Sequence, residues 1–130
     1  MNASSVSLVG NLVAAPEVRY ASTGRAMARL RIACNRSWQK DGEWQEETSF
    51  FDVDLFGELA ENVAESVTKG DRITVEGRLQ QQSWEKDGEK QYRVVVVADE
   101  VGASLRFATA KVVRSVRTNN VTTLAAAAAG

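Results

Sequence analysis

Two matching seven-residue segments constrain the fold of this chain more than any other feature. Residues 37–43 read Ser-Trp-Gln-Lys-Asp-Gly-Glu, and residues 83–89 read Ser-Trp-Glu-Lys-Asp-Gly-Glu. Asp-Gly between two extended runs favours a two-residue hairpin turn, because both central residues of that turn need positive φ, which Asp and Gly tolerate. Each segment therefore predicts a hairpin tip with an indole ring beside a lysine. The alternative, that each tryptophan merely pins its turn to the body of the protein, stays open at this point.

Apolar and polar residues alternate with a period of two over most of the chain, as is typical of strands with one packed face. The pattern predicts strands at about residues 4–13, 26–36, 44–56, 72–83 and 92–98, with a short extended stretch at 17–20. Asp99 and Glu100 are expected to end the last strand. Residues 58–68 have helical spacing and are followed by Gly70, so they predict one helix. Five long strands with a helix between the third and fourth are the element order of an OB-fold, a five-stranded Greek-key barrel, and the expected fold class is all-β.

Residues 103–114 also alternate and predict an extra C-terminal strand. A strand outside a closed barrel needs a partner edge, which another subunit supplies most economically. We therefore expect an OB-fold domain over residues 1–114, with a clamp strand at about 103–114, and a disordered tail over residues 115–130.

The chain has no histidine and one cysteine, Cys34. This composition excludes zinc sites, Ser-His-Asp and Cys-His catalysis, and an internal disulfide. Cys34 alternates with Leu30 and Ile32 and is expected to be a buried thiol, the alternative being an intersubunit disulfide with its own mate across a two-fold axis. With no leader and no apolar run long enough to cross a bilayer, the expected location is the cytoplasm, with no membrane contact.

An acidic pair is the one feature that offers a catalytic alternative. Asp52 and Asp54 lie two apart on one strand face, with Glu76 on another strand, and such carboxylates hold magnesium in some nucleases. An Asp-x-Asp pair is common by chance, so solvated surface charge is the preferred interpretation. We expect no cofactor, no metal and no enzyme activity.

Aromatic and cationic side chains coincide on the predicted hairpin tips and on outward strand positions. Phe50 and Phe56 share a face with Asp52 and Asp54, and because an unpaired carboxylate does not belong in a dry core, this face is expected to line a partly exposed groove. Rings interleaved with cations can stack bases of any sequence and follow their phosphates. The expected stacking rings are Trp38, Phe50, Phe56 and Trp84, with Trp44 either joining them or supporting the first hairpin. The expected phosphate contacts are Arg29, Arg31, Arg36, Lys40, Arg72, Arg78 and Lys86.

The net charge of −1 is unevenly distributed. Residues 101–130 contain four cations and no acid, so the preceding residues are acidic overall. A nucleic-acid binder with this balance relies on stacking and locally placed cations, and its affinity should depend less on salt than that of a lysine-rich protein.

Several of these segments resemble the bacterial single-stranded DNA-binding protein family. The resemblance covers about residues 6–98 and rests on Val9-Gly10-Asn11-Leu12, Pro16-Glu17-Val18-Arg19-Tyr20, Leu55-Phe56-Gly57, Val75-Glu76-Gly77-Arg78-Leu79 and Ser83-Trp84. Residues 98–112 further resemble the actinobacterial branch, whose extra strand clamps neighbouring subunits. The resemblance implies an OB-fold homotetramer that wraps single-stranded DNA without sequence preference in replication, recombination and repair, close to the nucleoid.

The chain departs from the family pattern in four places. Phe50 stands where the family usually has tryptophan, Asp52 where a basic residue is common, and Asp54 where an apolar one is. The acidic, hydrophobic tip that recruits other proteins in the family is missing from this sequence, and two explanations stay open: the chain is truncated, or it is a paralogue that coats DNA without recruiting those partners. These departures keep one alternative open, an OB-fold assembly factor that binds protein and touches nucleic acid only weakly.

Overall fold

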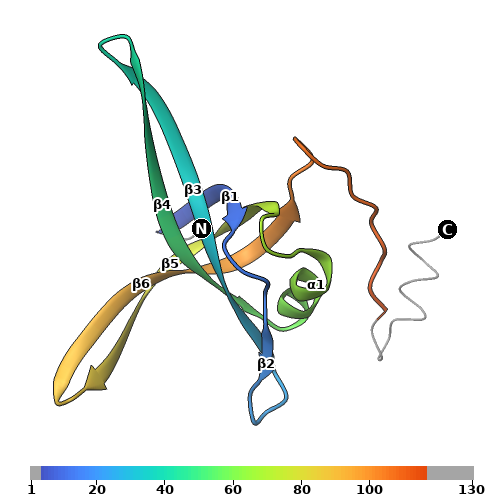
Figure 1. Ribbon diagram of the computed structural model, residues 1–130. Helices are drawn as coiled ribbons and strands as arrows, with labels where there is room; N and C mark the ends of the chain where they lie inside the picture. Colours follow the sequence, from blue (N-terminus) through green and yellow to red (C-terminus); the bar gives the residue numbers. More distant parts are fainter. Residues whose placement is uncertain (1–3, 117–130) are drawn as a thin grey trace.

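A computed structural model describes residues 4–116 of the chain (Figure 1). Its elements are β1 (Ser5–Leu12), β2 (Val18–Tyr20), β3 (Ala26–Lys40), β4 (Glu43–Phe56), α1 (Glu58–Ser66), β5 (Arg72–Lys86) and β6 (Glu89–Ala103). The five long strands, the short stretch and the helix occur in the predicted order. Four strand ends reach beyond their predicted positions, because each long hairpin is paired up to its turn.

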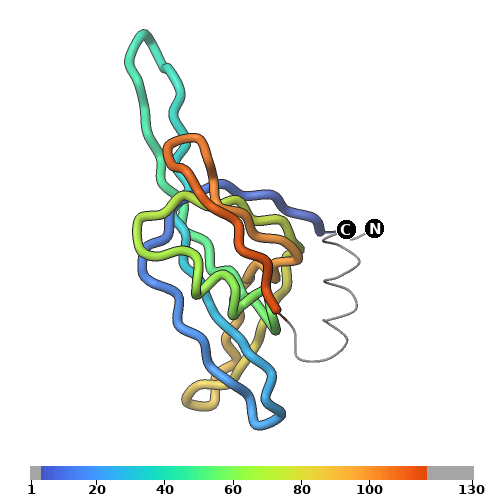
Figure 2. The backbone as a smooth tube through the Cα atoms, turned by 90° about the vertical axis from the view of Figure 1, so that its right-hand side faces the viewer, coloured from blue at the N-terminus to red at the C-terminus, as the bar shows by residue number. Residues whose placement is uncertain are grey.

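The strands form one sheet that closes on itself. Their order is β1-β5-β6-β4-β3-β2, and a further pairing between β1 and β3 joins Asn11 to Ala33 and Leu12 to Ile32. Figures 1 and 2 show the resulting barrel with α1 lying against it. This architecture confirms the predicted all-β OB-fold with one helix between the third and fourth long strands.

The barrel interior is filled by alternate residues of the long strands, as the period-two pattern predicts. Ile32, Val53, Leu55 and Ile73 are fully buried. The helix adds Ala60 and Val63 to the same core. One hydrophobic core therefore holds the barrel and the helix together. The outer parts of the two long hairpins add almost nothing to this core.

Two hairpins extend beyond the barrel as long arms (Figure 1). We call residues 33–50 the β3–β4 arm and residues 80–95 the β5–β6 arm. Asp41 and Asp87 both have φ of 52°, and Gly42 and Gly88 follow with φ of 80° and 79°. Positive φ at both central residues is the geometry of a primed hairpin turn, so both predicted tips are confirmed.

The predicted end of the last strand is wrong. β6 continues through Asp99 and Glu100 to Ala103, because Asp99 is the extra residue of a β-bulge: Glu76 pairs with Glu100, and Gly77 pairs with Ala98. A Cβ atom on Gly77 would lie 2.1 Å from the backbone oxygen of Val97, so glycine is required where the strands approach each other at the bulge.

Residues 104–116 leave the barrel as a segment without regular secondary structure, so the strand predicted at about 103–114 is not formed in this single chain. The Ser104 amide donates to the oxygen of Arg72, and the Ser115 hydroxyl donates to Asn62 of α1. Phe107 and Val112 are 76% and 92% exposed. The clamp strand stays a prediction, since it needs an edge from another subunit. The tail predicted at 115–130 lies, beyond its first two residues, outside the described part of the chain.

Candidate nucleic-acid interface

The predicted stacking rings lie on the two arms and on the strands at their base. Trp44 is 69% exposed, Phe50 50% and Trp84 42%, while Trp38 and Phe56 are half-buried. Trp44 is too exposed to support the first hairpin by packing, which removes one of its two predicted roles. Trp44, Phe50 and Trp84 are therefore open to solvent, as stacking requires, whereas Trp38 and Phe56 are open in part.

Four of these five rings carry an arginine of the same chain on one face. The guanidinium carbon lies within contact distance of the ring centroid for Arg36 over Trp38 (4.8 Å), Arg31 over Phe50 (5.1 Å), Arg25 over Phe56 (4.6 Å) and Arg93 over Trp84 (5.2 Å). Such cation–π contacts are worth about 0.5–1 kcal/mol at exposed sites. Each ring therefore brings a positive charge to the place where a base would stack.

Arg25 and Arg93 were not among the sequence-predicted residues. A signal for Arg93 was present, because counting back from the Asp87-Gly88 turn pairs Trp84 with Gln91 and Gln82 with Arg93, which makes Arg93 the diagonal neighbour of Trp84. A signal for Arg25 was also present, because the same count from the Asp41-Gly42 turn pairs Phe56 with Met27 and so makes Arg25, two residues before Met27, the diagonal neighbour of Phe56.

The rings do not all share one face of the sheet. Opposite residues in an antiparallel pair point to the same side, so Phe50, Phe56 and Trp44 share the outward side of β3 and β4. Trp38 pairs with Gln45 and lies on the other side of the β3–β4 arm, whereas Trp44 pairs with Gln39. Nucleic acid on this arm meets Trp38 and Trp44 from opposite sides.

The interpretation of Asp54 as solvated surface charge is wrong. Asp54 is 1% exposed, the one buried charged side chain among the described residues. Its carboxylate accepts two hydrogen bonds from Arg29, from Nε at 2.5 Å and from the terminal nitrogen at 2.8 Å, and a third from Gln82 at 3.1 Å. Arg29 is therefore committed to a structural pair, and we leave it out of the phosphate contacts that we propose below.

The neighbouring acid is paired less tightly. Arg31 donates to Asp52 at 3.2 Å, with side chains 53% and 23% exposed. An exposed pair of this kind contributes little, so Arg31 remains free to exchange its carboxylate for a phosphate. Among residues 4–116, no group of three acidic, cysteine or histidine side chains is placed to hold a metal ion.

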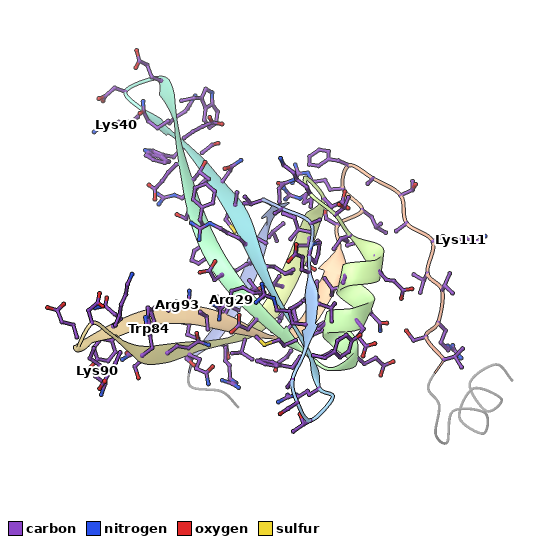
Figure 3. The ribbon with its side chains drawn as sticks, turned by 60° about the horizontal axis from the view of Figure 1, so that its bottom comes forward. Arg29, Lys40, Trp84, Lys90, Arg93 and Lys111 are labelled. Carbon is purple, nitrogen blue, oxygen red and sulfur yellow. The ribbon has the colours of Figure 1, made fainter. Side chains whose placement is uncertain are left out.

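The remaining predicted cations are spread over the molecule. Lys40 and Lys86 are exposed next to the two turns, as Figure 3 shows for Lys40. Arg78 is half-buried beside the base of the β5–β6 arm. Arg72 begins β5 at the end opposite to Trp84 and lies 5.6 Å from the ring of Phe107. The structure thus brings Arg31, Arg36, Lys40, Arg78 and Lys86 to the arms or their bases, but not Arg72.

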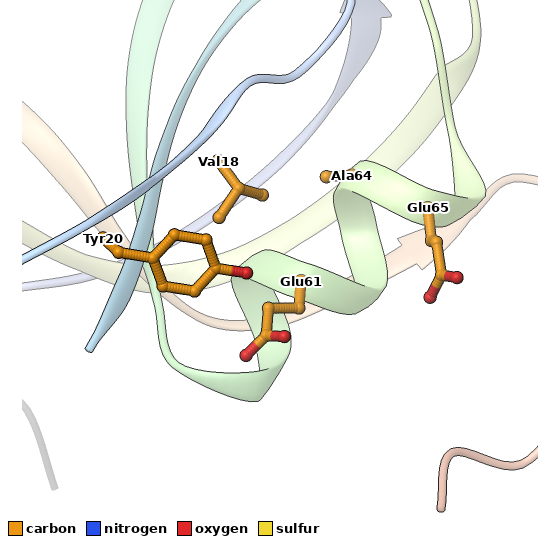
Figure 4. A pocket seen from close by; sticks show the side chains of 5 residues that line it. All are labelled: Val18, Tyr20, Glu61, Ala64 and Glu65. Carbon is orange, nitrogen blue, oxygen red and sulfur yellow. The ribbon is translucent and has the colours of Figure 1, made fainter. Parts of the chain in front are cut away.

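An open cleft of about 350 Å³ lies elsewhere, between β2 and α1 (Figure 4). Val18, Tyr20 and Ala64 line it together with Glu61 and Glu65. Two carboxylates repel a phosphate backbone, so this cleft is not part of the nucleic-acid interface.

Cys34 is a free, half-buried thiol at the start of the β3–β4 arm. Burial raises the pKa of its thiol. A Cβ atom on Gly10 would lie 2.9 Å from its sulfur, so β1 packs closely over it. The predicted buried thiol is half-buried, and the intersubunit disulfide stays a prediction.

An OB barrel with two long arms that carry exposed, arginine-covered rings defines a class of nucleic-acid-binding protein. Residues 3–104 match the model of the Single-strand binding protein family, and the chain belongs to that family.

Relatives and a solved structure agree with this assignment. The chain is 44% identical over 120 residues to the single-stranded DNA-binding protein of Paenarthrobacter aurescens, covering 89% of this chain and 70% of the relative. It is 46% identical to that of Corynebacterium glutamicum, covering 89% and 53%. A crystal structure of a deletion mutant of the single-stranded DNA binding protein from Thermus aquaticus matches with a TM-score of 0.70 and 36% identity, covering 78% of this chain and half of that one. No helix within residues 4–116 is long and apolar enough to cross a membrane.

Proposed function

We propose that this chain binds and coats single-stranded DNA without sequence preference, by stacking bases on Trp38, Phe50, Phe56, Trp84 and Trp44. The observation that carries the proposal is the pairing of exposed rings with arginines on arms that stand away from the core. Membership of the Single-strand binding protein family supports it.

The arginines have a defined part in this mechanism. A stacked base is worth about 1–3 kcal/mol, whereas an exposed cation–π contact is worth about 0.5–1 kcal/mol. A base can therefore take the place of a guanidinium or stack on the opposite ring face, and either arrangement leaves the cation next to the phosphate that follows the base. Arg25 and Arg93 join Arg31, Arg36, Lys40, Arg78 and Lys86 as the proposed phosphate contacts.

Ring faces distinguish bases poorly, because every base offers a π surface, and this accounts for binding without sequence preference. We further propose a homotetramer in which residues 104–114 clamp neighbouring subunits and the DNA passes from arm to arm. Such an assembly protects single strands during replication, recombination and repair in the cytoplasm, and it requires no catalytic step or cofactor.

Substitution of one tryptophan on each arm tests the proposal. Trp38→Ala with Trp84→Ala removes two stacks, each worth about 1–3 kcal/mol, so affinity for oligo-dT should fall about 30-fold or more. Fluorescence anisotropy of labelled oligo-dT measures the affinity, and sedimentation shows whether the assembly is intact. Tyr20→Ala, which truncates a ring that is 63% exposed at the cleft beside α1, is the control and should bind as the unsubstituted chain does. Unchanged affinity in the double variant would refute the stacking assignment.

A second candidate function follows from the charge of the β3–β4 arm. Residues 36–47 contain four carboxylates and two cations, an excess that suits a basic protein partner better than DNA. An assembly factor of this kind would show little quenching of tryptophan fluorescence by poly-dT, whereas a DNA coat quenches strongly at both low and high salt.

A further inference from the structure

The two arms are joined to each other by little backbone pairing. Their strands meet in a parallel ladder between β4 and β6 that contains two residue pairs, Val53 with Val96 and Asp54 with Val97. Beyond this ladder the β3–β4 arm and the β5–β6 arm diverge as separate two-stranded ribbons (Figure 1). Something other than the ladder has to fix the direction of one arm relative to the other.

A hydrogen-bonded cluster lies where the arms diverge. Gln82 of β5 donates from Nε2 to Asp54 of β4 at 3.1 Å, and its Oε1 accepts from Arg29 of β3, also at 3.1 Å. Arg29 and Asp54 are held together by the two shorter bonds described above. Gln82 therefore uses both ends of its amide to bridge the β5–β6 arm to β3 and β4 at the base of the β3–β4 arm. Among the described residues, no other side-chain hydrogen bond joins the β5–β6 arm to β3 or β4.

The position of Gln82 along its arm matters for the rings. Gln82 is three residues beyond Leu79, which pairs with Val96 of the short ladder, and two residues before Trp84 on the same strand face. Its partner across the arm is Arg93, the arginine that covers the Trp84 ring. Figure 3 shows Arg29 at the base of this arm, with Trp84, Arg93 and Lys90 farther out along it.

Because Asp54 is buried, the cluster opposes a change in the direction of the β5–β6 arm. Asp54 is 1% exposed, so its carboxylate depends on Arg29 and Gln82 for the hydrogen bonds that water would otherwise supply. The hydrogen bond donated to Asp54 raises the pKa of Arg29. A swing of the β5–β6 arm away from β4 would break the bond from Gln82 to Asp54 Oδ2, so each carboxylate oxygen would keep only the one donor that Arg29 supplies.

We propose that Gln82, Arg29 and Asp54 form a polar strut that sets the angle between the two arms and so positions Trp84 relative to Phe50 and Phe56. These three are positioning residues, and they act on DNA through the rings. The effect on DNA rests on the proposed function, whereas the effect on the arm angle does not.

The arm angle can be measured without DNA. Spin labels are attached at positions 41 and 87, the two turns, in a Cys34→Ser background, with labelled chains diluted into unlabelled chains so that one assembly holds one labelled chain. Double electron–electron resonance then gives the distribution of tip-to-tip distances. Gln82→Leu should broaden this distribution or move its centre, because it removes the bridge while leaving the Arg29–Asp54 pair in place.

Gln80→Leu is the matched control. Gln80 lies on the same strand face as Gln82, two residues closer to the barrel, is exposed, and makes no side-chain hydrogen bond in the described chain. The substitution should leave the distance distribution unchanged. If Gln82→Leu also leaves it unchanged, the strut proposal is overturned whatever the DNA affinity does.

A second measurement connects the angle to binding. Two linked contact regions bind a strand that reaches both more tightly when their geometry is fixed, so Gln82→Leu should lower affinity for an oligo-dT of about 16 nucleotides on the order of tenfold. Affinity for a pentanucleotide, which reaches the rings of one arm, should stay within about twofold. Equal losses on both lengths, shared by Gln80→Leu, would mean that these amides contact DNA directly and would overturn the positioning role. If the unsubstituted chain binds neither length, the proposed function fails while the distance measurement still decides on the strut.

Discussion

Arg29 and Arg31 are two residues apart on one face of β3, yet the residues around them give them different tasks. Arg29 is opposite Asp54, which the β5–β6 arm covers, and Arg31 is opposite Asp52, which water reaches. Covering the carboxylate of Asp54 removes its hydration, so the fold needs Arg29 as its hydrogen-bond donor. Water can take the place of Arg31 at Asp52, so Arg31 can bind a phosphate instead. Depth of burial, rather than residue type, separates a structural arginine from one that can bind DNA.

This difference is testable on stability. Arg29→Met leaves Asp54 buried without its main partner and should lower the free energy of unfolding by about 3 kcal/mol, toward the lower end of such cases because Arg29 is itself 31% exposed. Adding Asp54→Leu removes the stranded charge and should recover most of the loss. Urea unfolding of both variants at one protein concentration measures this, with Arg31→Met expected to stay within about 1 kcal/mol. A double variant no more stable than Arg29→Met would contradict the account.

At the level of the elements, the β3–β4 arm combines rings for stacking with an excess of negative charge. Glu46 and Glu47 lie near Trp44 and Trp38 in the strand pairing, so they oppose the phosphates of any base stacked there. Stacking has to outweigh this repulsion for the arm to bind DNA. The arm should therefore gain affinity when the two carboxylates are neutralised.

Glu46→Gln with Glu47→Gln should raise affinity for oligo-dT by roughly two- to thirtyfold at low salt, since each exposed charge contact is worth about 0.2–1 kcal/mol. The gain should nearly vanish at 1 M salt, where screening acts over about 3 Å. Glu61→Gln with Glu65→Gln, which neutralises the same charge at the cleft beside α1, is the control and should have little effect. A gain of equal size in both pairs would show that overall charge, and not the arm, is responsible.

The elements also show how far sequence reasoning reaches. The Asp-Gly turns fix the register of both hairpins, and that register places Trp38 opposite Gln45 and Arg93 diagonal to Trp84, so these relations were available from the sequence. Alternation predicts on which face Asp54 lies but not how deep, because depth depends on Gln82 from a strand distant in the sequence. The bulge at Asp99 was missed for a similar reason: two adjacent acids look like a strand end until the opposite strand is known.

For the whole molecule, the proposed assembly depends on residues 104–116. Leu105, Phe107 and Val113 are 65%, 76% and 83% exposed, so the rest of the chain leaves these apolar side chains uncovered. A neighbouring subunit that pairs with this segment would cover these side chains. The alternation of apolar residues predicted a strand here. The strand edge with which it would pair belongs, in the proposed assembly, to another subunit, so a single chain does not form it.

Ending the chain at Ala103 tests this assignment. Every residue of the buried core precedes that point, so the barrel should stay folded by circular dichroism. The proposed tetramer should dissociate at protein concentrations where the full chain keeps the tetramer's mass, as measured by sedimentation at successive dilutions. A shortened chain with the same mass at every dilution would show that residues 104–130 do not hold the subunits together.

The arms also act as levers. With a rise of about 3.3 Å per residue, the Trp84 ring lies roughly 17 Å from Leu79 at the fulcrum. A rotation of about 10° there displaces the ring by roughly 3 Å, nearly the distance at which two carbon atoms touch. The position of a ring at the far end of such an arm consequently depends on the angle at its base. A substitution at the base, many residues from any nucleotide, can lower the affinity for DNA as much as the loss of a ring.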